Sequence, residues 1–252
     1  MTPEETLLQK RFADLKRQSE LNNRYTYTGF LNLAEQELFY KTFSTIAARE
    51  CMLWGGFEDA ERKVLRFGSP ETLWYDEEFP LTCIVIKPVS RKFAEKLSHR
   101  DVLGALMNLG IERNLLGDIV VKEHVCYVMC LSRIADFIVE ELRRIKHTEV
   151  NCSLSETMPE DASPDLQELS LIVSSLRADG LISKVFHMSR NESDIMFSRG
   201  LVFVNGREAS KSSVNLKAGD VVSVRGHGKF RFSGAIHETK KGNLSVTVYK
   251  YV

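Results

Sequence analysis

Apolar residues in the first part of the chain recur at the three- and four-residue spacing that is typical of helices. Residues 7–21, LLQKRFADLKRQSEL, and residues 33–47, LAEQELFYKTFSTIA, both carry this pattern and predict two amphipathic helices. The charged residues 58–66 predict a third, short helix before the break at the sequence FGSPET. We therefore expect residues 1–78 to form a helical N-terminal domain.

Strand and helix patterns alternate in residues 80–154. The predicted elements are a strand, a helix, two strands, a helix and a strand, over residues 80–88, 98–110, 117–131, 132–147 and 148–154. Ser98 is the expected cap of the first helix and Gly110 its end, and the basic stretch 143–146 falls in the expected last turn of the second helix. This order is that of the split βαβ, ferredoxin-like fold, which RRM domains share. The inner strands carry no aromatic signature of the RRM type, so the fold alone does not assign a function.

Two further helices and a set of strands are predicted at the C-terminal end. Residues 155–168 contain several acidic residues and two prolines, which predicts a linker. Beyond it, residues 177–186 predict a helix. Ser189 is followed three residues later by Glu192, a capping box that starts a second helix. The next strand, LVFVNG, ends in an Asn-Gly hairpin turn. We expect residues 169–252 to form one compact domain, and the whole chain to be of the α+β class.

Charge is distributed unevenly along the chain. The 34 basic residues balance the 34 acidic residues, but residues 177–252 carry 13 basic and 6 acidic side chains, a net charge of +7. A basic end on a neutral chain predicts that one domain binds a polyanion. No apolar run approaches the roughly 18 residues of a membrane helix, and the N-terminus has acidic residues where a signal peptide is basic. We therefore expect a cytoplasmic protein that does not bind a membrane.

The residues that carry chemistry predict no catalytic, metal or cofactor site. The five cysteines are odd in number and scattered, which is typical of a reducing compartment. Cys126 and Cys130 lie near His124, but four residues along a strand separate two side chains by about 13 Å, too far for one ion. The sequence has no glycine-rich dinucleotide fingerprint, no P-loop and no cluster typical of catalysis. We expect neither an enzyme nor a small-molecule substrate.

The residues between Arg177 and Val224 resemble the S-four domain, named after ribosomal small-subunit protein four. The matching residues are Arg177, Asp179, Ser189, Arg190, Gly200, Val202, Val204, Asn205, Gly206, Gly219, Asp220, Val222 and Val224. The resemblance implies that structured RNA binds to the face that carries both helix starts. The physical chemistry agrees, because a helix N-terminus presents free N–H groups and partial positive charge. Arg190 at such a start adds a forked donor that matches phosphate.

The residues after the S-four pattern, 225–252, predict an additional basic hairpin. Arg225, Lys229 and Arg231 are interleaved with Phe230 and Phe232, and alternation on a strand places the cations on one face and the phenyl rings on the other. The predicted RNA-binding residues of the whole chain are Arg177, Lys184, Ser189, Arg190, Asn205, Arg207, Lys211, Arg225 and Lys229.

Nearly the whole chain resembles the bacterial YlmH family. The resemblance rests on the motifs GGFEDAERK (55–63) and HRDVLGALMNLGIERNLLGDI (99–119), followed by the S-four pattern. It implies a non-enzymatic, ribosome-associated RNA-binding protein, linked to quality control of stalled large-subunit complexes that carry peptidyl-tRNA. The implied partners are rRNA, the large ribosomal subunit and tRNA.

Several alternatives remain open in the sequence. The middle domain is the expected place of chemistry in an rRNA-modifying enzyme, and residues 1–150 are the expected binding surface of a protein-interaction module of the cell-division machinery. The motif 99–119 either maintains the fold by capping and packing or forms a second RNA contact around Arg100, Arg113 and Asn114. The stretch 61–63, Glu-Arg-Lys, is either a solvated helix face or part of an interaction surface.

Overall fold

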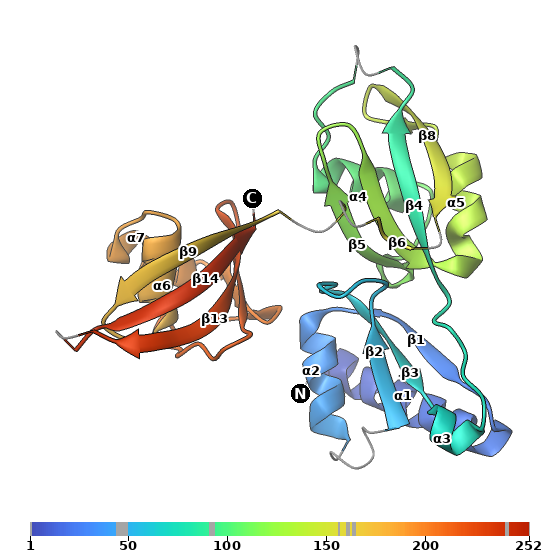
Figure 1. Ribbon diagram of the computed structural model, residues 1–252, viewed down its shortest axis with the longest axis horizontal. Helices are drawn as coiled ribbons and strands as arrows, with labels where there is room; N and C mark the ends of the chain where they lie inside the picture. Colours follow the sequence, from blue (N-terminus) through green and yellow to red (C-terminus); the bar gives the residue numbers. More distant parts are fainter. Residues whose placement is uncertain are drawn as a thin grey trace. The chain divides into compact units, whose positions relative to one another are not determined.

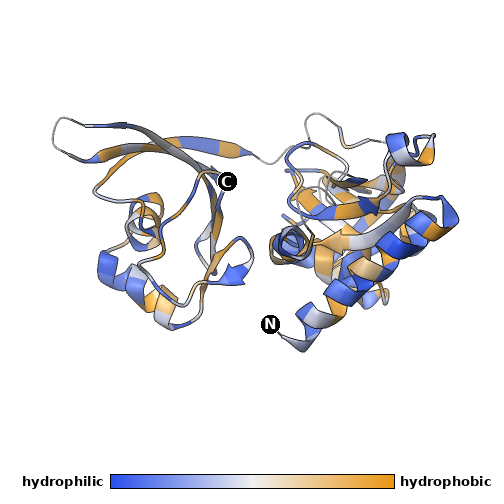
Figure 2. Ribbon diagram, turned by 90° about the horizontal axis from the view of Figure 1, so that it is seen from below, coloured by the Kyte–Doolittle hydropathy of each residue, from blue (hydrophilic) through white to orange (hydrophobic). Residues whose placement is uncertain are grey.

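The computed structural model describes residues 2–43, 50–90, 94–155, 157–159, 162, 165–239 and 242–251. The chain divides into two compact units, Met1–Ser163 and Pro164–Val252, and each is described by itself. Both units combine helices with antiparallel sheets, so the fold belongs to the α+β class that the sequence predicts (Figure 1). Hydrophilic and hydrophobic residues alternate along the elements of both units, as expected for elements with one buried face (Figure 2). None of the described helices is long and apolar enough to cross a membrane.

The N-terminal part of the first unit is a three-stranded antiparallel sheet with helices. Its elements are α1 (Pro3–Asn22), β1 (Thr26–Leu31), α2 (Leu33–Thr42), β2 (Cys51–Trp54), β3 (Lys63–Phe67) and α3 (Pro70–Leu73), and the sheet order is β1-β3-β2. Helices α1 and α2 bury Phe12, Leu15 and Phe39 against Leu65 and Phe67 of the central strand. Capping boxes formed by Thr2–Glu5 and Asn32–Glu35 start the two helices.

The prediction of a helical N-terminal domain over residues 1–78 is therefore wrong. The charged residues 58–66 do not form a helix, because residues 63–67 are the central strand and pair with strands on both sides. Four consecutive residues of this strand, 64–67, are buried, and this tertiary pairing outweighs the local helix preference of the charged residues before them. Residues 44–47 of the second predicted helix lie outside the described part of the chain.

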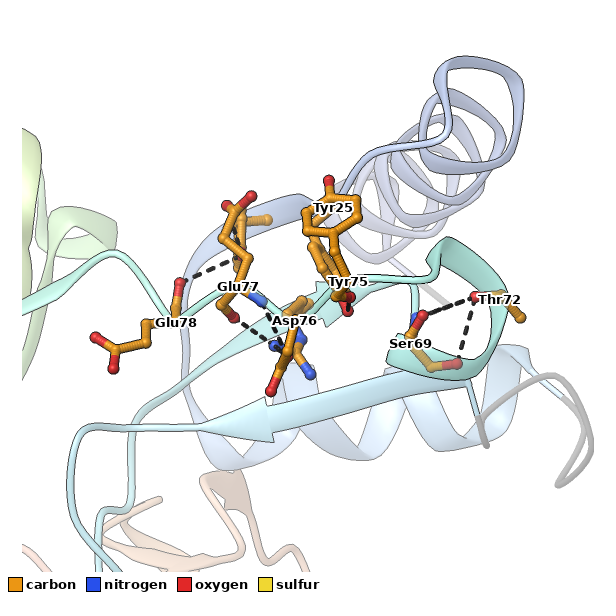
Figure 3. A network of polar contacts seen from close by, with 9 residues as sticks. Tyr25, Ser69, Thr72, Tyr75, Asp76, Glu77 and Glu78 are labelled. Atoms are coloured by element: carbon orange, nitrogen blue, oxygen red, sulfur yellow. Dashed lines mark hydrogen bonds and ion pairs between the residues drawn. The ribbon is translucent and has the colours of Figure 1, made fainter.

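Arg66 fixes the segment that leads from this sheet into the middle domain. Its guanidinium group is buried, donates from Nη1 to Asp76 Oδ1 (3.0 Å) and to the Glu77 carbonyl oxygen (2.6 Å), and lies 4.5 Å from the ring centroid of Tyr25. It also lies 5.1 Å from the ring centroid of Phe79. Figure 3 shows Tyr25, Asp76 and Glu77 in one network of polar contacts. The hydrogen bonds and cation–π contacts of Arg66 thus fix the segment that contains Asp76, Glu77 and Phe79, from which the chain enters the first strand of the middle domain.

The middle part of the first unit is a five-stranded antiparallel sheet with two helices. Its elements are β4 (Leu81–Pro88), α4 (His99–Asn108), η3 (Arg113–Leu115), β5 (Leu116–Val121), β6 (Cys126–Leu131), η4 (Ser132–Ile134), α5 (Ala135–Glu141), β7 (Arg144–Ile145) and β8 (Thr148–Ser155). The order β5-β6-β4-β8-β7 places the first strand between the third and the last, as in the split βαβ fold. Residues of α4 and α5 pack on one face, and Phe30 and Val64 of the N-terminal part contact the other, so every residue of β6 is buried.

The second helix of this part is shorter than the sequence predicts. Helix α5 ends at Glu141, and the basic stretch 143–146 runs from the residue before β7 through β7 into the turn that follows, not through a last helical turn. The reason is that Ile145 is fully buried and pairs with Thr148, which closes a two-residue hairpin turn. Tertiary burial of this isoleucine outweighs the helical pattern.

The second unit wraps a six-stranded antiparallel sheet around two helices. Its elements are β9 (Leu166–Val173), α6 (Ala178–Val185), α7 (Arg190–Ser198), β10 (Val202–Val204), β11 (Arg207–Glu208), β12 (Val221–Val224), β13 (Gly228–Glu238) and β14 (Leu244–Tyr251), with the order β11-β10-β12-β13-β14-β9. Both helices lie on one side of the sheet (Figures 1 and 2). They contribute Leu181, Ile182 and Phe197 to a core that includes Phe230 and Phe232 of the sheet.

The predicted linker 155–168 is too long at both ends. Ser155 is the last residue of β8, and residues 166–168 open β9, which pairs along its whole length with the C-terminal strand β14. The second unit accordingly begins at Pro164, before the predicted boundary at 169. The predicted basic hairpin, β13 and β14, is an integral part of the same sheet, because β13 pairs with β12 and β14 with β9.

Candidate nucleic-acid interface

The start of α6 is held by an arginine–carboxylate pair and by a loop. Arg177 is the N-cap residue and donates from Nε and Nη2 to the two carboxylate oxygens of Asp179, at 3.0 and 2.8 Å. The side chain of Arg177 is 45% exposed and that of Asp179 only 9%. The first two N–H groups of the helix donate to the carbonyl oxygens of Val214 and Ser212. Lys211, which precedes Ser212 and is exposed, therefore lies beside this helix start.

The start of α7 is a complete capping box. The N–H of Glu192 donates to Ser189 Oγ (3.2 Å), and the N–H of Ser189 donates to Glu192 Oε2 (2.7 Å). The helix begins at Arg190, as the sequence predicts. One turn later the buried Ser193 donates from its hydroxyl to the carbonyl oxygen of Asp179, at 3.2 Å. This bond ties the beginning of α7 to the beginning of α6.

Asp179 contacts both helix starts, because its carboxylate binds Arg177 and its carbonyl oxygen accepts from Ser193. Burial by itself raises the pKa of its carboxyl group. Hydrogen bonds from Arg177 and from the N–H of Gly180, together with the charges of Arg177 and Arg190, act in the opposite direction and leave the pKa lowered. The carboxylate is thus ionised at neutral pH and holds Arg177 in one orientation. Since a guanidinium group has five N–H donors, the two that Asp179 takes leave others available at the exposed end of the side chain.

We call Arg177, Ser189, Arg190 and Lys211 the helix-start face. All four residues are exposed, and they surround two helix N-termini that are connected by a buried hydrogen bond. A helix N-terminus carries partial positive charge, and two arginines and a lysine add full charges. Two of the acidic residues of this region are engaged locally, since Asp179 binds Arg177 and Glu192 caps its own helix, whereas Asp194 of α7 is exposed and its charge also acts on Arg177. The arrangement is chemically suited to bind phosphate groups.

A second set of cations lies on the opposite side of the sheet from the helices. Phe230 and Phe232 of β13 point into the core, so Lys229 and Arg231 point to the outer face, as the alternation predicts. The Nζ of Lys229 lies 4.2 Å from the ring centroid of Tyr251, and the guanidinium carbon of Arg231 lies 5.7 Å from that of Tyr249.

Arg225 belongs to this outer face. Its guanidinium carbon lies 4.6 Å from the ring centroid of Phe203, whose neighbour Val202 points into the core. Three cation–aromatic pairs thus follow neighbouring strands, and each ring restricts the position of its cation. The sequence prediction selected Arg225 and Lys229 but not the aromatic partners. The same two-residue alternation in the final segment YKY, 249–251, is the signal that identifies them.

The remaining predicted residues lie apart from the helix-start face or have structural partners. Asn205 (φ +49°) and Gly206 (φ +75°) form the predicted hairpin turn. The amide of Asn205 donates to Asp220 Oδ1 (2.8 Å) and accepts from the N–H of Val221 (2.9 Å), so it connects two turns of the fold. Lys184 is exposed in the last turn of α6, and Arg207 is partly buried in the edge strand β11.

The two motifs of the first unit that carry the family resemblance meet each other. Asp118, from the motif 99–119, accepts hydrogen bonds from the backbone N–H groups of Glu61 (2.6 Å) and Arg62 (3.2 Å). Arg62 in turn donates from Nε to the carbonyl oxygen of Leu116 (3.1 Å) and from Nη2 to that of Phe30 (2.9 Å). The stretch 61–63 is therefore neither helical nor a solvated face. It connects the N-terminal sheet with the middle domain.

Arg113 takes part in the same joint. It is half-buried, and its Nη1 donates to the carbonyl oxygens of Leu116 (2.6 Å) and Gly117 (3.1 Å). Burial, together with the nearby charge of Arg62, lowers the pKa of Arg113 to about 10. Of the three residues considered for a second RNA contact, Arg113 is thus engaged in the fold, Asn114 donates to Glu112, and Arg100 is exposed.

The cysteines are free thiols in the described structure. Burial raises the pKa of Cys126 to about 11, and burial with the neighbouring Cys83 raises that of Cys130 to about 12. These thiols are neutral at physiological pH. Within the described ranges, no three His, Cys, Asp or Glu side chains gather at positions that hold a metal ion.

The fold and the site define an α+β protein whose basic C-terminal unit presents cations around two capped helix starts. Comparison with known proteins identifies the family. Residues 75–158 match the family described as "Putative RNA-binding domain in YlmH". The chain is 31% identical over 198 residues to the ribosome-associated protein quality control protein P2 of Bacillus subtilis (strain 168), which covers 77% of this chain and 75% of that protein. The chain belongs to the YlmH family, as its motifs predict.

A solved structure is also similar. It is the cell division protein ylmH from Streptococcus pneumoniae, which is 24% identical, with a TM-score of 0.48. The similarity covers 62% of this chain and 93% of that one.

Proposed function

We propose that this protein is a non-enzymatic, cytoplasmic RNA-binding protein that docks on structured rRNA of the large ribosomal subunit and contacts tRNA in ribosome-associated quality control. The observation that carries the proposal is the helix-start face, where three exposed cations surround two connected helix N-termini. Membership of the YlmH family supports an RNA-binding, ribosome-associated role, because the Bacillus subtilis relative is named for ribosome-associated quality control.

The helix-start face is suited to the RNA backbone rather than to base edges. Arg177 is oriented by Asp179 before RNA binds, and Arg190 extends from a helix start whose backbone the capping box fixes. Such contacts supply affinity and register, and each one releases counterions and makes binding depend on salt. Specificity then follows from the shape of a folded RNA, which is how double-stranded RNA is commonly recognised.

The test is the sedimentation of the full-length protein with large ribosomal subunits at low and high salt, with two variants of α7. Arg190→Glu reverses a charge at the helix start, where an acidic residue is compatible with the helix dipole, so the helix is expected to remain folded. Arg199→Glu reverses a charge at the exposed C-cap of the same helix and serves as the matched control; because an acidic residue there opposes the helix dipole, thermal unfolding of both variants is measured alongside.

We expect wild type and Arg199→Glu to travel with large subunits at low salt, and Arg190→Glu to remain at the top of the gradient. The slope of the logarithm of the rRNA-binding constant against the logarithm of the salt concentration should become less steep by about one in the Arg190→Glu variant, as for the loss of one phosphate contact. Equal binding of Arg190→Glu and wild type would refute the assignment of this face.

Two other functions give different results. An rRNA-modifying enzyme would leave a missing base modification in a strain that lacks the gene, which chemical mapping of rRNA detects. A protein-interaction module of the cell-division machinery would keep its partners after RNase treatment and in high salt, whereas electrostatic RNA binding would not.

A further inference from the structure

An open depression lies on the helix side of the middle domain, far along the chain from the helix-start face. Helix α4, the end of α5 and the hairpin turn before β8 line it, and its volume is about 660 Å³. A second, adjoining depression of about 390 Å³ shares Arg143 and Arg144 with it and continues toward Asn151 of β8. Together they form a shallow path over the surface rather than an enclosed pocket.

The floor of the depression is kept free of side chains. A Cβ atom added to Gly104 would have no atom within 4 Å, so the space above this residue is open. Gly104 lies inside α4, where glycine is less favourable than alanine by roughly 1 kcal/mol. Ala105 follows it, and Asn108 lines the same surface one turn later. A small-residue floor lets a broad ligand approach the helix backbone closely.

The rim of the depression is basic. Four cations line it, Arg100, Arg143, Arg144 and Lys146, against two acidic residues, Asp101 and Glu141. We call these four cations the basic rim.

Asp101, one of the two acidic residues of the depression, already has partners within the chain. Asp101 accepts from the N–H and the hydroxyl of Ser98 and from Lys146 Nζ at 2.8 Å. The hydrogen bond from Lys146 and those from Ser98 lower the pKa of Asp101 to about 2. Arg144 pairs with Glu149 at 3.3 Å. Arg100 and Arg143 are both exposed, and neither side chain forms a hydrogen bond or an ion pair with another residue in the described part of the chain.

The position of Lys146 is maintained at a cost to the backbone. Its φ angle is +53°, in the left-handed region, which glycine and asparagine adopt more easily than lysine. Asn-Gly is the common choice in such a two-residue hairpin turn, whereas this chain has Lys-His. Backbone strain of this kind is concentrated at functional sites. The strained turn places a cation at the rim, where Asp101 orients it.

We infer that the basic rim is a second RNA site, which binds phosphodiester groups of the RNA backbone independently of the helix-start face. The inference rests on the proposed function, because it assumes that the protein binds RNA. Sites for small molecules enclose most of their ligand, whereas this open path with cations spaced along it is complementary to a polyanionic chain. The whole site also lies inside residues 75–158, the part of the chain that matches the YlmH RNA-binding family.

The test uses the full-length protein and two probes, deproteinised large-subunit rRNA and intact large subunits. The variant Arg100→Gln/Arg143→Gln removes the two unpaired cations of the basic rim. The control Arg17→Gln/Arg133→Gln removes two exposed cations of the same unit that do not line the depression. We expect the rim variant to bind rRNA roughly tenfold more weakly, with a salt dependence less steep by about two, and the control to bind as wild type does.

A third variant separates binding from folding. Lys146→Asn introduces a residue that favours positive φ, which offsets the lost ion pair with Asp101, so the stability of the hairpin should change little while rRNA affinity falls. Thermal unfolding of each variant is measured beside its affinity. Lys146→Asn/Asp101→Asn removes both partners, and a loss of affinity that persists in this double variant without a loss of stability supports a direct contact of Lys146.

The outcomes distinguish this inference from the proposed function. If Arg190→Glu weakens rRNA binding but the rim variant binds as the control does, the proposed function stands and the second site is refuted. If the rim variant loses affinity for intact subunits only, the depression binds an acidic protein surface and the RNA assignment is refuted. If wild type does not bind deproteinised rRNA and Arg190→Glu changes nothing, both proposals are refuted.

Discussion

Arg62 holds the joint between the N-terminal sheet and the middle domain, and its replacement by alanine should destabilise the first unit. The guanidinium group donates to the carbonyl oxygens of Leu116 and Phe30 at 3.1 and 2.9 Å. A hydrogen bond from a charged donor contributes about 1.5–3 kcal/mol. Because Arg62 is only half-buried and Leu116 keeps its bond from Arg113, the loss should be smaller than the sum for two bonds, which is about 3–6 kcal/mol. The expected loss is about 2–4 kcal/mol in the free energy of unfolding.

This loss is large enough to measure by thermal unfolding of the full chain. For a unit of this size, 1 kcal/mol shifts Tm by roughly 2–4 °C, so Arg62→Ala should lower the Tm of the first unit by roughly 4–16 °C. Arg62→Lys keeps the charge but not the planar fork and should fall between wild type and alanine. Arg17→Ala, at an exposed arginine of α1, is the surface control and should change stability by less than about 0.5 kcal/mol. A Tm of Arg62→Ala equal to that of Arg17→Ala would refute the role of the joint.

Three further changes test other parts of the fold. Gly117→Ala should cost about 1–3 kcal/mol in a urea titration, because its Cβ would lie 2.6 Å from Phe30 Cε1 and 2.9 Å from Met129 Cβ. Asn205→Ala should lower the unfolding free energy of the second unit by roughly 2–3 kcal/mol, since it removes two hydrogen bonds and leaves alanine at φ +49°. The thiol of Cys130, with a pKa raised to about 12, should react slowly with iodoacetamide at pH 8 until the chain unfolds. Because the folded state favours the neutral thiol, the raised pKa of Cys130 stabilises the fold fully below the unfolded pKa of about 9. This contribution is lost as the pH rises toward 12, so the free energy of unfolding from urea titrations should fall between these two pH values.

Features encoded by a few neighbouring residues could be predicted from the sequence. The helix caps at Ser98 and Ser189 and the Asn205 turn form where the sequence places them, because the caps depend on contacts within three residues and the turn on the conformational preference of Asn-Gly. The strands β3 and β9 could not be predicted in the same way. Strand β3 is central in its sheet, and β9 pairs with the last strand of the chain, so both are determined by partners that are distant in the sequence.

The candidate site was predictable in its residue types and less so in its geometry. Arg177, Ser189 and Arg190 gather at the helix starts, where the resemblance places them. Arg225 and Lys229 lie on the other side of the same sheet, which follows only once the pairing of β12 and β13 is known. The residues predicted to bind RNA therefore lie on two faces of the second unit.

The arginines of this chain show why spacing alone does not separate structural from binding residues. Arg100 lies in the first turn of helix α4 and Arg113 follows that helix in the same motif, yet Arg113 donates to two carbonyl oxygens of its own chain while Arg100 remains exposed. A guanidinium group binds a carbonyl oxygen and a phosphate oxygen by the same geometry. What decides between them is whether the fold brings unpaired carbonyl oxygens to the side chain, as the bulged start of β5 does at Leu116 and Gly117. Within the described part of the chain, no carbonyl oxygen accepts a hydrogen bond from the side chain of Arg100 or Arg190, and both side chains are exposed. The joint and the two proposed binding faces thus rely on the same guanidinium chemistry, and the difference between them lies in the surrounding backbone.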